Sequence, residues 1–239
     1  MTGLFTLELV QAVSDWQRGP TERTKIARGE RLKALMLTLP AYFRECNQLC
    51  FRQECHQKDR TFQVLIQNSL PETIASWTTS LDVAKGFKGG VVYGNDDRSI
   101  ILSITPPNGA VVANLDRLYQ EREFQQALEK YGSQIDYFQN GAGKYGNTQK
   151  EVVLELGSLS STHIYSYGGY SSTLDDLVGA FVLERGREPD DAERSHLSGL
   201  AGQPWWLSEE ATWRMLQRAV SSFEAKIDEL LGRQRKGAP

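Results

Sequence analysis

The residues best placed for chemistry in this sequence are a carboxamide and a carboxylate two positions apart, Gln149 and Glu151. From Gln149 onward, polar and aliphatic residues alternate, a pattern that predicts a strand packed on one face. The aliphatic positions of that face are Val152, Leu154 and Leu156. Gln149 and Glu151 therefore fall together at the start of the opposite face, which we expect to be open. A glycine-rich polar segment, residues 139–147, precedes the strand and is expected to be a flexible loop beside the site.

An arginine stands in the middle of a second predicted strand, residues 49–56. Side-chain alternation places Arg52 on the same face as Glu54 and His56. An arginine at such a position is costly unless it pairs with a carboxylate or binds an anion. Both interpretations stay open, since an exposed Arg52–Glu54 pair would contribute only about 0–1 kcal/mol.

A run of hydroxyl residues leads into a predicted helix. Its members are Ser76, Thr78, Thr79 and Ser80. We expect Ser80 to cap that helix and Asp82 to stabilise its first turn. The buried side of the helix would carry Val83, Ala84 and Phe87. Capping explains Ser80 and does not explain why Ser76, Thr78 and Thr79 precede it.

Residues 141–146 match the GxGxxG spacing of dinucleotide-binding loops, but the required order of elements is missing. That fingerprint needs a strand before the glycines and a helix after them, so that pyrophosphate meets the helix N-terminus. Here the sequence predicts a strand after the glycines. A P-loop is excluded as well, because its first glycine would fall at Phe138 and Tyr145 replaces the Ser or Thr that binds magnesium. The sequence also has no HxxxH zinc pair and no GxSxG nucleophile elbow.

Composition limits the broad class of protein. The chain has 239 residues, of which 40% are hydrophobic, enough for one large domain or a domain with an extension. A net charge of −3 gives no whole-chain argument for nucleic-acid binding. No apolar run reaches the roughly 18 residues that span a bilayer, and residues 1–16 lack the basic start of a secretory signal. We therefore expect a cytoplasmic protein with no membrane contact.

Three cysteines, Cys46, Cys50 and Cys55, lie close together in the sequence. Their odd number and crowding favour reduced thiols, which fits the cytoplasm. The spacing, with His56 beside Cys55, is not that of a usual zinc site. We expect structural thiols and no bound metal.

Hydrophobic periodicity divides the chain into an N-terminal helical segment, residues 1–44, a strand-rich core, residues 45–170, and a helical C-terminal extension packed on the core, residues 171–239. These segments predict an α+β fold. The helices are expected at 4–16, 20–39, 115–131, 174–183, 189–200 and 208–232. The further strands are expected at 91–93, 99–104, 111–113 and 162–167.

Three motifs follow one another along the chain: an aromatic-arginine strand, an aromatic-hydroxyl segment that enters a helix, and Gln-x-Glu at the start of a strand. They are Phe51-Arg52, Trp77 to Ser80 followed by Ala84 and Phe87, and Gln149-Lys150-Glu151. In this order they resemble the Arg-Ser-Glu class of mono-ADP-ribosyltransferases, which includes cholera toxin and the clostridial toxins that modify Rho proteins or actin. The likeness covers roughly residues 45–170. The resemblance implies an ADP-ribosyltransferase-like fold of two packed antiparallel β-sheets, with NAD in the cleft between them.

The resemblance also implies a catalytic group. Glu151 matches the catalytic glutamate, and Thr78 matches the serine whose hydroxyl orients it. Gln149 matches a position that is glutamate in members modifying arginine and glutamine in members modifying asparagine. A glutamine cannot act as a general base, which argues against arginine as the acceptor.

A further implication concerns the binding of NAD. Arg52 would hold the phosphates through its planar fork of donors. The residues implied for the cofactor site are Arg52, Thr78, Thr79, Ser80 and Phe87. Two positions depart from the family pattern: Gln53 stands where glycine is usual beside nicotinamide, and Thr78 replaces serine but keeps the hydroxyl.

The activity implied is transfer of ADP-ribose from NAD, without a metal, to a macromolecular acceptor, either a protein side-chain amide or a nucleobase. Cleavage of the nicotinamide–ribose bond builds oxocarbenium character on the ribose, which Glu151 would stabilise. The family analogy further implies a bacterial or phage toxin or effector, reaching its target cell by a signal-independent route and controlled by a neutralising partner protein.

Two alternatives use the same fold. An NAD glycohydrolase would pass ADP-ribose to water and release nicotinamide without labelling a macromolecule. A non-catalytic module would bind NAD or a partner without turnover, an alternative that the Gln53 departure leaves open.

Overall fold

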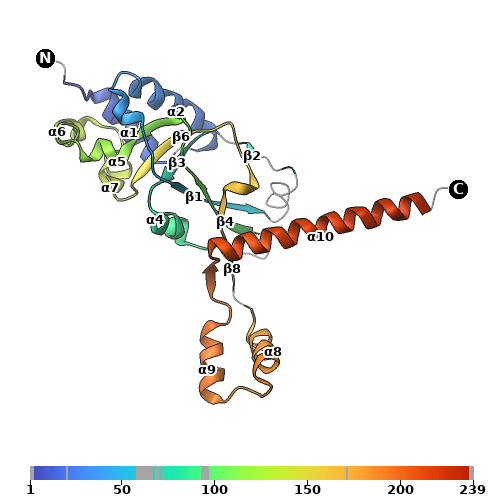
Figure 1. Ribbon diagram of the computed structural model, residues 1–239. Coiled ribbons are helices and arrows are strands. Elements are labelled where there is room, and N and C mark those ends of the chain that lie inside the picture. Colours follow the sequence, from blue (N-terminus) through green and yellow to red (C-terminus); the bar gives the residue numbers. More distant parts are fainter. Residues whose placement is uncertain are drawn as a thin grey trace. The chain divides into compact units, whose positions relative to one another are not determined.

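The computed structural model describes residues 3–19, 21–57, 67, 70–71, 73–92, 97–170 and 172–236 (Figure 1). Its strands are β1 (Cys50–Gln57), β2 (Leu70–Pro71), β3 (Ile74–Thr78), β4 (Asp97–Ile104), β5 (Val111–Asn114), β6 (Glu151–Glu155), β7 (Ser158–Leu159), β8 (Ile164–Tyr170) and β9 (Pro204–Trp206). Seven of these form an antiparallel sheet in the order β5-β6-β3-β1-β4-β8-β9, and β2 pairs with β7. The predicted α+β class is confirmed at this level.

Helices precede, separate and follow the groups of strands along the chain. The α-helices are α1 (Leu7–Gln17), α2 (Glu22–Met36), α4 (Leu81–Gly86), α5 (Leu115–Gln120), α6 (Arg122–Tyr131), α7 (Ala142–Tyr145), α8 (Leu174–Arg185), α9 (Asp191–Leu200) and α10 (Glu209–Lys236). The short 3₁₀ helices are η1 (Ala41–Arg44), η2 (Phe87–Gly89), η3 (Gly132–Gln134), η4 (Phe138–Asn140) and η5 (Ser161–His163). The predicted helices are confirmed, except that residues 115–131 divide into α5 and α6 at Glu121, whose backbone is extended.

One predicted strand, at residues 91–93, is not formed at the two residues that the structure describes. Val91 and Val92 lie outside any strand, and Tyr93 lies outside the described residues. Val92 N instead donates a hydrogen bond to Ser99 Oγ of β4 (2.9 Å). The expected strand at 91–93 is therefore wrong for its first two residues, whereas β4 confirms the strand expected at 99–104.

The segment predicted as a flexible loop, residues 139–147, contains the end of η4 and all of α7. Gly141 lies so close to α1 that a Cβ there would collide with the carbonyl oxygen of Ser14. Ala142 N donates a hydrogen bond to Ser14 Oγ (3.3 Å). The segment is thus a short helix tied to α1, which the glycine content alone did not indicate.

The chain forms two compact units. The first consists of residues 1–52, 68–86 and 102–163, and the second of residues 53–67, 87–101 and 164–239. These boundaries differ from those of the predicted segments, because the N-terminal helices share one hydrophobic core with the strands of the first unit.

The core of the first unit forms between the two N-terminal helices and the sheet. Val10 and Val13 of α1 are fully buried, each contributing about 1.5–3 kcal/mol of transfer free energy. They belong to one cluster with Ile74 of β3 and Val153 of β6. Gly29 lets α2 lie close on β3, because a Cβ at this position would stand 3.0 Å from Ile74 Cγ2. The end of α1 is thereby held near β3 and β6.

The second unit contains β8, β9 and the last three helices. Gly168 of β8 pairs with Trp206 of β9. α8 and α9 lie side by side (Figure 1), and each begins with a capping box. α10 contacts β8, where the buried Thr212 Oγ1 accepts a hydrogen bond from Tyr167 N (3.1 Å).

Candidate functional site

Three adjacent strands bring the sequence motifs to neighbouring positions in the first unit. Phe51 of β1 lies opposite Thr78 of β3, and Thr78 lies opposite Glu151 of β6. Residues directly opposite one another in antiparallel strands share a face of the sheet. The motifs, which lie far apart in the sequence, therefore meet at one level of the sheet.

Glu151 is the first residue of β6 and is only 4% exposed. Its Oε1 accepts hydrogen bonds from Ser76 Oγ (2.5 Å) and Trp16 Nε1 (2.9 Å), and its Oε2 accepts one from Gln17 Nε2 (3.3 Å). The aliphatic face of the strand is buried as predicted. The prediction that Glu151 lies on an open face is wrong, because the C-terminal end of α1 covers the carboxylate.

Ser76 connects this carboxylate with the surface. It is exposed in the middle of β3, while its neighbours Ala75 and Trp77 are buried. Its Oγ also accepts a hydrogen bond from Trp16 Nε1 (3.0 Å). A ligand that reaches Ser76 is therefore one hydroxyl away from Glu151.

Gln17 is oriented by a buried tyrosine of α5. Tyr119 Oη donates a hydrogen bond to Gln17 Oε1 (2.6 Å). The amide nitrogen of Gln17 is then left to donate to Glu151 Oε2 and to Gly146 O (3.1 Å). Four elements, α1, β3, α5 and β6, thus contribute to one polar network inside the first unit.

The surroundings of this network shift the pKa values of Glu151 and Tyr119. Burial raises the pKa of the Glu151 carboxyl, and the hydrogen bonds from Ser76, Trp16 and Gln17 oppose that rise. Burial also raises the pKa of Tyr119, and the charge of Glu151 adds to the effect. All three groups that donate to Glu151 are neutral, so the carboxylate is stabilised by dipoles alone.

Gln149 does not share the strand face of Glu151. β6 begins at Glu151, Gln149 lies in the preceding turn, and Lys150 has a left-handed backbone with φ of 43°. The predicted alternation from Gln149 to Glu151 is therefore wrong, since a left-handed residue interrupts the pleat between them. Gln149 is half-buried in that turn.

The hydroxyl residues within 76–80 make different contacts from those expected, except at Ser80. Thr78 is buried, and its Oγ1 accepts a hydrogen bond from Ser80 N (3.0 Å). Thr79 N donates to Lys150 O (3.2 Å), which joins the end of β3 to the start of β6. Ser80 Oγ accepts from Val83 N (3.4 Å) and caps α4 as predicted. The hydroxyl that contacts the carboxylate is that of Ser76 (2.5 Å).

Arg52 lies on the other face of the sheet. Because side chains alternate along β1, Arg52 points away from the face that Phe51 shares with Thr78 and Glu151. Arg52 and the carboxylate are therefore not brought together on one face.

Gln53 and Phe87 both belong to the second unit. Gln53 is 7% exposed, and its Nε2 donates a hydrogen bond to Gly90 O (2.5 Å). A buried amide thus stands where the resemblance implies a glycine. Phe87 is 42% exposed in η2, so the prediction that it is buried is wrong, whereas Ala84 is buried as expected.

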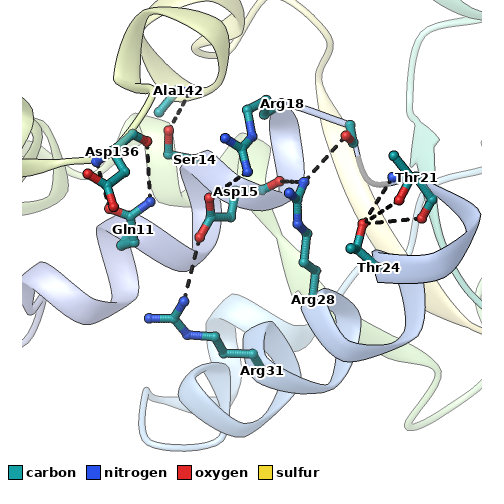
Figure 2. Close-up of polar contacts among 11 residues, drawn as sticks. Gln11, Ser14, Asp15, Arg18, Thr21, Thr24, Arg28, Arg31, Asp136 and Ala142 are labelled. Carbon is teal, nitrogen blue, oxygen red and sulfur yellow. Dashed lines mark hydrogen bonds and ion pairs between the residues drawn. The ribbon is translucent and has the colours of Figure 1, made fainter.

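Ionic contacts fix the end of α1 against α2 (Figure 2). Asp15 carboxylate oxygens lie 3.4 Å from Arg18 Nη2 and 3.5 Å from Arg31 Nη1. Arg28 Nη1 donates hydrogen bonds to Asp15 O (2.8 Å) and Gly19 O (3.3 Å). The turn that carries Trp16 and Gln17 is consequently attached to α2.

The opposite side of α1 is attached to the chain before β6 (Figure 2). Gln11 Oε1 accepts a hydrogen bond from Asp136 N (2.8 Å), and Gln11 Nε2 donates one to Asp136 O (3.3 Å). Ser14 Oγ accepts a hydrogen bond from Ala142 N at the start of α7. The end of α1 that covers Glu151 is thus attached both to α2 and to the chain before β6.

Sequence reasoning missed Trp16, Gln17 and Tyr119 as members of the site. Trp16 is the last residue of the helix expected at 4–16, Gln17 follows it, and Tyr119 lies within the helix expected at 115–131. No local signal pointed to these three residues. For Ser76 there was one, because a strand over residues 76–78 places the Ser76 and Thr78 side chains on the same face.

Comparisons with known protein families, curated proteins and solved structures found no match. Among the side chains that the structure describes, no group of three or more His, Cys, Asp and Glu could hold a metal ion. Within the same part of the chain, no helix combines the length and apolar character needed to cross a membrane.

Proposed function

We propose that this chain is a mono-ADP-ribosyltransferase with an ADP-ribosyltransferase-like fold, and that Glu151 is its catalytic carboxylate. The observation that carries the proposal is the hydrogen bond from Ser76 Oγ to Glu151 Oε1 between β3 and β6, beside the β1 strand. It matches in residue type the serine–glutamate pair that the sequence resemblance implies. Ser76 takes the orienting role that the resemblance assigned to Thr78.

The chemistry proposed for Glu151 follows from its surroundings. As the bond between nicotinamide and ribose breaks, positive charge develops on the ribose, and a fixed carboxylate in a site with little water stabilises that charge. Oε1 is held by two donors, whereas Oε2 has only the longer contact with Gln17 (3.3 Å). Oε2 is therefore the oxygen that accepts a hydrogen bond from a ribose hydroxyl, after the Gln17 side chain rotates away.

The NAD-binding part of the proposal has two kinds of support. Thr79 and Ser80 are half-buried just after the end of β3, three and four residues from the exposed Ser76, and would lie beside a nucleotide that reaches Ser76. The role of Phe87 on the ring rests on the resemblance alone, and Arg52, on the sheet face opposite to Glu151, is left out of the proposed site.

Gln149 is proposed to position the acceptor. It lies in the turn before Glu151 and can both donate and accept hydrogen bonds, which suits a protein side-chain amide or a nucleobase amine. A toxin or effector acting in the cytoplasm, with a neutralising partner protein, is the corresponding proposal for its biological setting.

The test uses purified full-length protein with NAD labelled in its adenylate half and a cell lysate. We expect label in macromolecules with the wild type and a loss of more than about 100-fold with Glu151→Gln. Protease and nuclease digestion of the product then identifies a protein or nucleic-acid acceptor. Release of nicotinamide without labelled macromolecule would indicate an NAD glycohydrolase instead.

Glu155→Gln is the matched control. Glu155 lies on the same strand but its side chain is 39% exposed and pairs with Lys33 Nζ (2.6 Å). Labelling by this variant should equal that of the wild type. Equal labelling by Glu151→Gln and the wild type would overturn the assignment of the carboxylate.

A second candidate is favoured by the burial of Glu151: a non-catalytic module in which the carboxylate only anchors α1. Its exposure of 4% and its three donors suit a structural role. In that case the wild type would release no nicotinamide, and Glu151→Gln would change only the free energy of unfolding.

A further inference from the structure

Two thiols meet at the start of β1 in the first unit. Cys46 Sγ and Cys50 Sγ lie 3.7 Å apart. Each sulfur also lies within hydrogen-bond distance of Gln48 O, at 3.8 Å and 3.6 Å respectively. Cys46 is 7% exposed and Cys50 is fully buried. The two sulfurs are thus in contact, and of the two residues only Cys46 keeps some exposure to solvent.

The pKa values of the two thiols shift in opposite directions. A hydrogen bond from the Cys50 thiol to Cys46 Sγ lowers the pKa of Cys46 and raises that of Cys50. Burial raises the pKa of both groups, while the Arg117 guanidinium lowers that of Cys46 and the Asp116 carboxylate raises it. Because the thiolate is the nucleophilic form, Cys46 is the sulfur that attacks an oxidant and Cys50 the one that resolves the product.

The segment between the two residues belongs to no helix or strand. A disulfide has a bond length of about 2.05 Å, so the sulfurs must approach by roughly 1.7 Å. Residues 45–49 lie outside any helix or strand, and Cys46 lies in this connection. The approach therefore breaks no hydrogen-bond ladder of a helix or sheet.

We propose that Cys46 and Cys50 form a hydroperoxide-sensitive modification site that closes into an intrachain disulfide. The Cys46 thiolate attacks the O–O bond of a hydroperoxide, giving a sulfenic acid on Cys46 and an alkoxide that leaves as the alcohol after protonation. The Cys50 sulfur then attacks the sulfenic sulfur, forming the S–S bond. Its thiol proton and the hydroxyl of the sulfenic acid leave as water.

This inference is independent of the proposed transferase activity, since it uses none of the side chains that hold Glu151. It also changes the interpretation of the cysteines. Their crowding in the sequence predicts structural thiols, whereas the contact between Cys46 and Cys50 supports a redox reaction of these two. Cys55, which belongs to the second unit, is outside the pair.

The sequence allows a direct test by peptide mapping. Trypsin cleavage after Arg44 and Arg52 yields one peptide, residues 45–52, with both Cys46 and Cys50, while Cys55 falls in residues 53–58. The full-length protein is treated with hydrogen peroxide, alkylated and digested. We expect the 45–52 peptide to become two hydrogens lighter and to resist alkylation until a dithiol reductant is added. The 53–58 peptide should stay alkylated.

Two variants sharpen the result. Cys55→Ser should form the same bridged 45–52 peptide, and Cys50→Ser should instead accumulate sulfenic or sulfinic acid on Cys46. The proposal is overturned if wild-type 45–52 stays alkylated at both cysteines, if it is joined to 53–58, or if Cys46 becomes a sulfinic acid without a bridge. The wild-type peptide masses decide the question even if Cys50→Ser does not fold.

Discussion

At the scale of single residues, Ser76 is the group whose loss should separate catalysis from stability. Its side chain is exposed, so water replaces the lost hydroxyl at Glu151 Oε1, and Ser76→Ala should lower the free energy of unfolding by less than about 1 kcal/mol. The carboxylate would lose a fixed orientation, and we expect nicotinamide release to slow by up to about 100-fold.

The matched control for Ser76→Ala is Thr38→Ala. Thr38 is also exposed and also donates a hydrogen bond, to Leu35 O (2.7 Å), but lies outside the network. Thr38→Ala should leave the rate of nicotinamide release unchanged. Equal rates in Ser76→Ala and Thr38→Ala would contradict the orienting role of Ser76.

Loss of the Tyr119 hydroxyl should lower the free energy of unfolding, because Tyr119, unlike Ser76, is buried. Tyr119→Phe removes the hydroxyl that holds Gln17 Oε1, at a cost of about 1 kcal/mol in the free energy of unfolding. Chemical denaturation measures this difference. Tyr42→Phe, at a tyrosine that is 49% exposed, is the control and should change the free energy of unfolding by less.

The raised pKa of Glu151 predicts how stability depends on pH. The folded protein binds a proton at this carboxyl more tightly than the unfolded chain, in which the pKa takes its ordinary value of 4.5. The contribution to stability is therefore fully present below pH 4.5 and is lost as pH rises through the folded-state pKa. Wild type should lose stability relative to Glu151→Gln over that range in denaturation series. If wild type gains stability relative to the variant as pH rises, the donors outweigh burial and the sign is wrong.

At the scale of elements, the contact between α7 and α1 depends on a glycine. Gly141→Ala would drive a Cβ into the carbonyl oxygen of Ser14, and such overpacking costs about 1–3 kcal/mol. Gly157→Ala is the control in the same unit, because a Cβ there meets nothing within 4 Å. Urea denaturation should show a large loss for the first variant and none for the second. Similar stability in both would show that α7 moves away from α1 without cost.

Most elements could be predicted from the sequence, because their signals are local. The apolar spacing of α1 and α2, the cap at Ser80 and the alternation in β6 each follow from residues within one or two turns or strand steps. The start of β6 could not be predicted, since nothing in the sequence marks Lys150 as left-handed. The short helix α7 was missed because its position depends on packing against Ser14, which is distant in the sequence.

At the scale of the whole chain, the site was predicted in part. Pairing of β1, β3 and β6 brings the three motifs to one level, but the hydroxyl bonded to Glu151 is that of Ser76, whereas the prediction named Thr78. The cover over Glu151 was not predictable, because Trp16 and Gln17 reach it from a segment 134 or more residues away. The grouping of Arg52 with Glu151 could not be checked from the sequence, because alternation within one strand does not reveal the register between strands. That register places Phe51, and not Arg52, on the face of Thr78 and Glu151.

The central claim is that Glu151 is a catalytic carboxylate in a site that cleaves NAD. Its most direct test is the initial rate of nicotinamide release by the purified protein, measured for the wild type, Glu151→Gln and Glu155→Gln under conditions in which all three are folded. The account predicts release by the wild type and Glu155→Gln, and a rate lower by more than about 100-fold for Glu151→Gln. No release by the folded wild type, or equal release by Glu151→Gln, would contradict it.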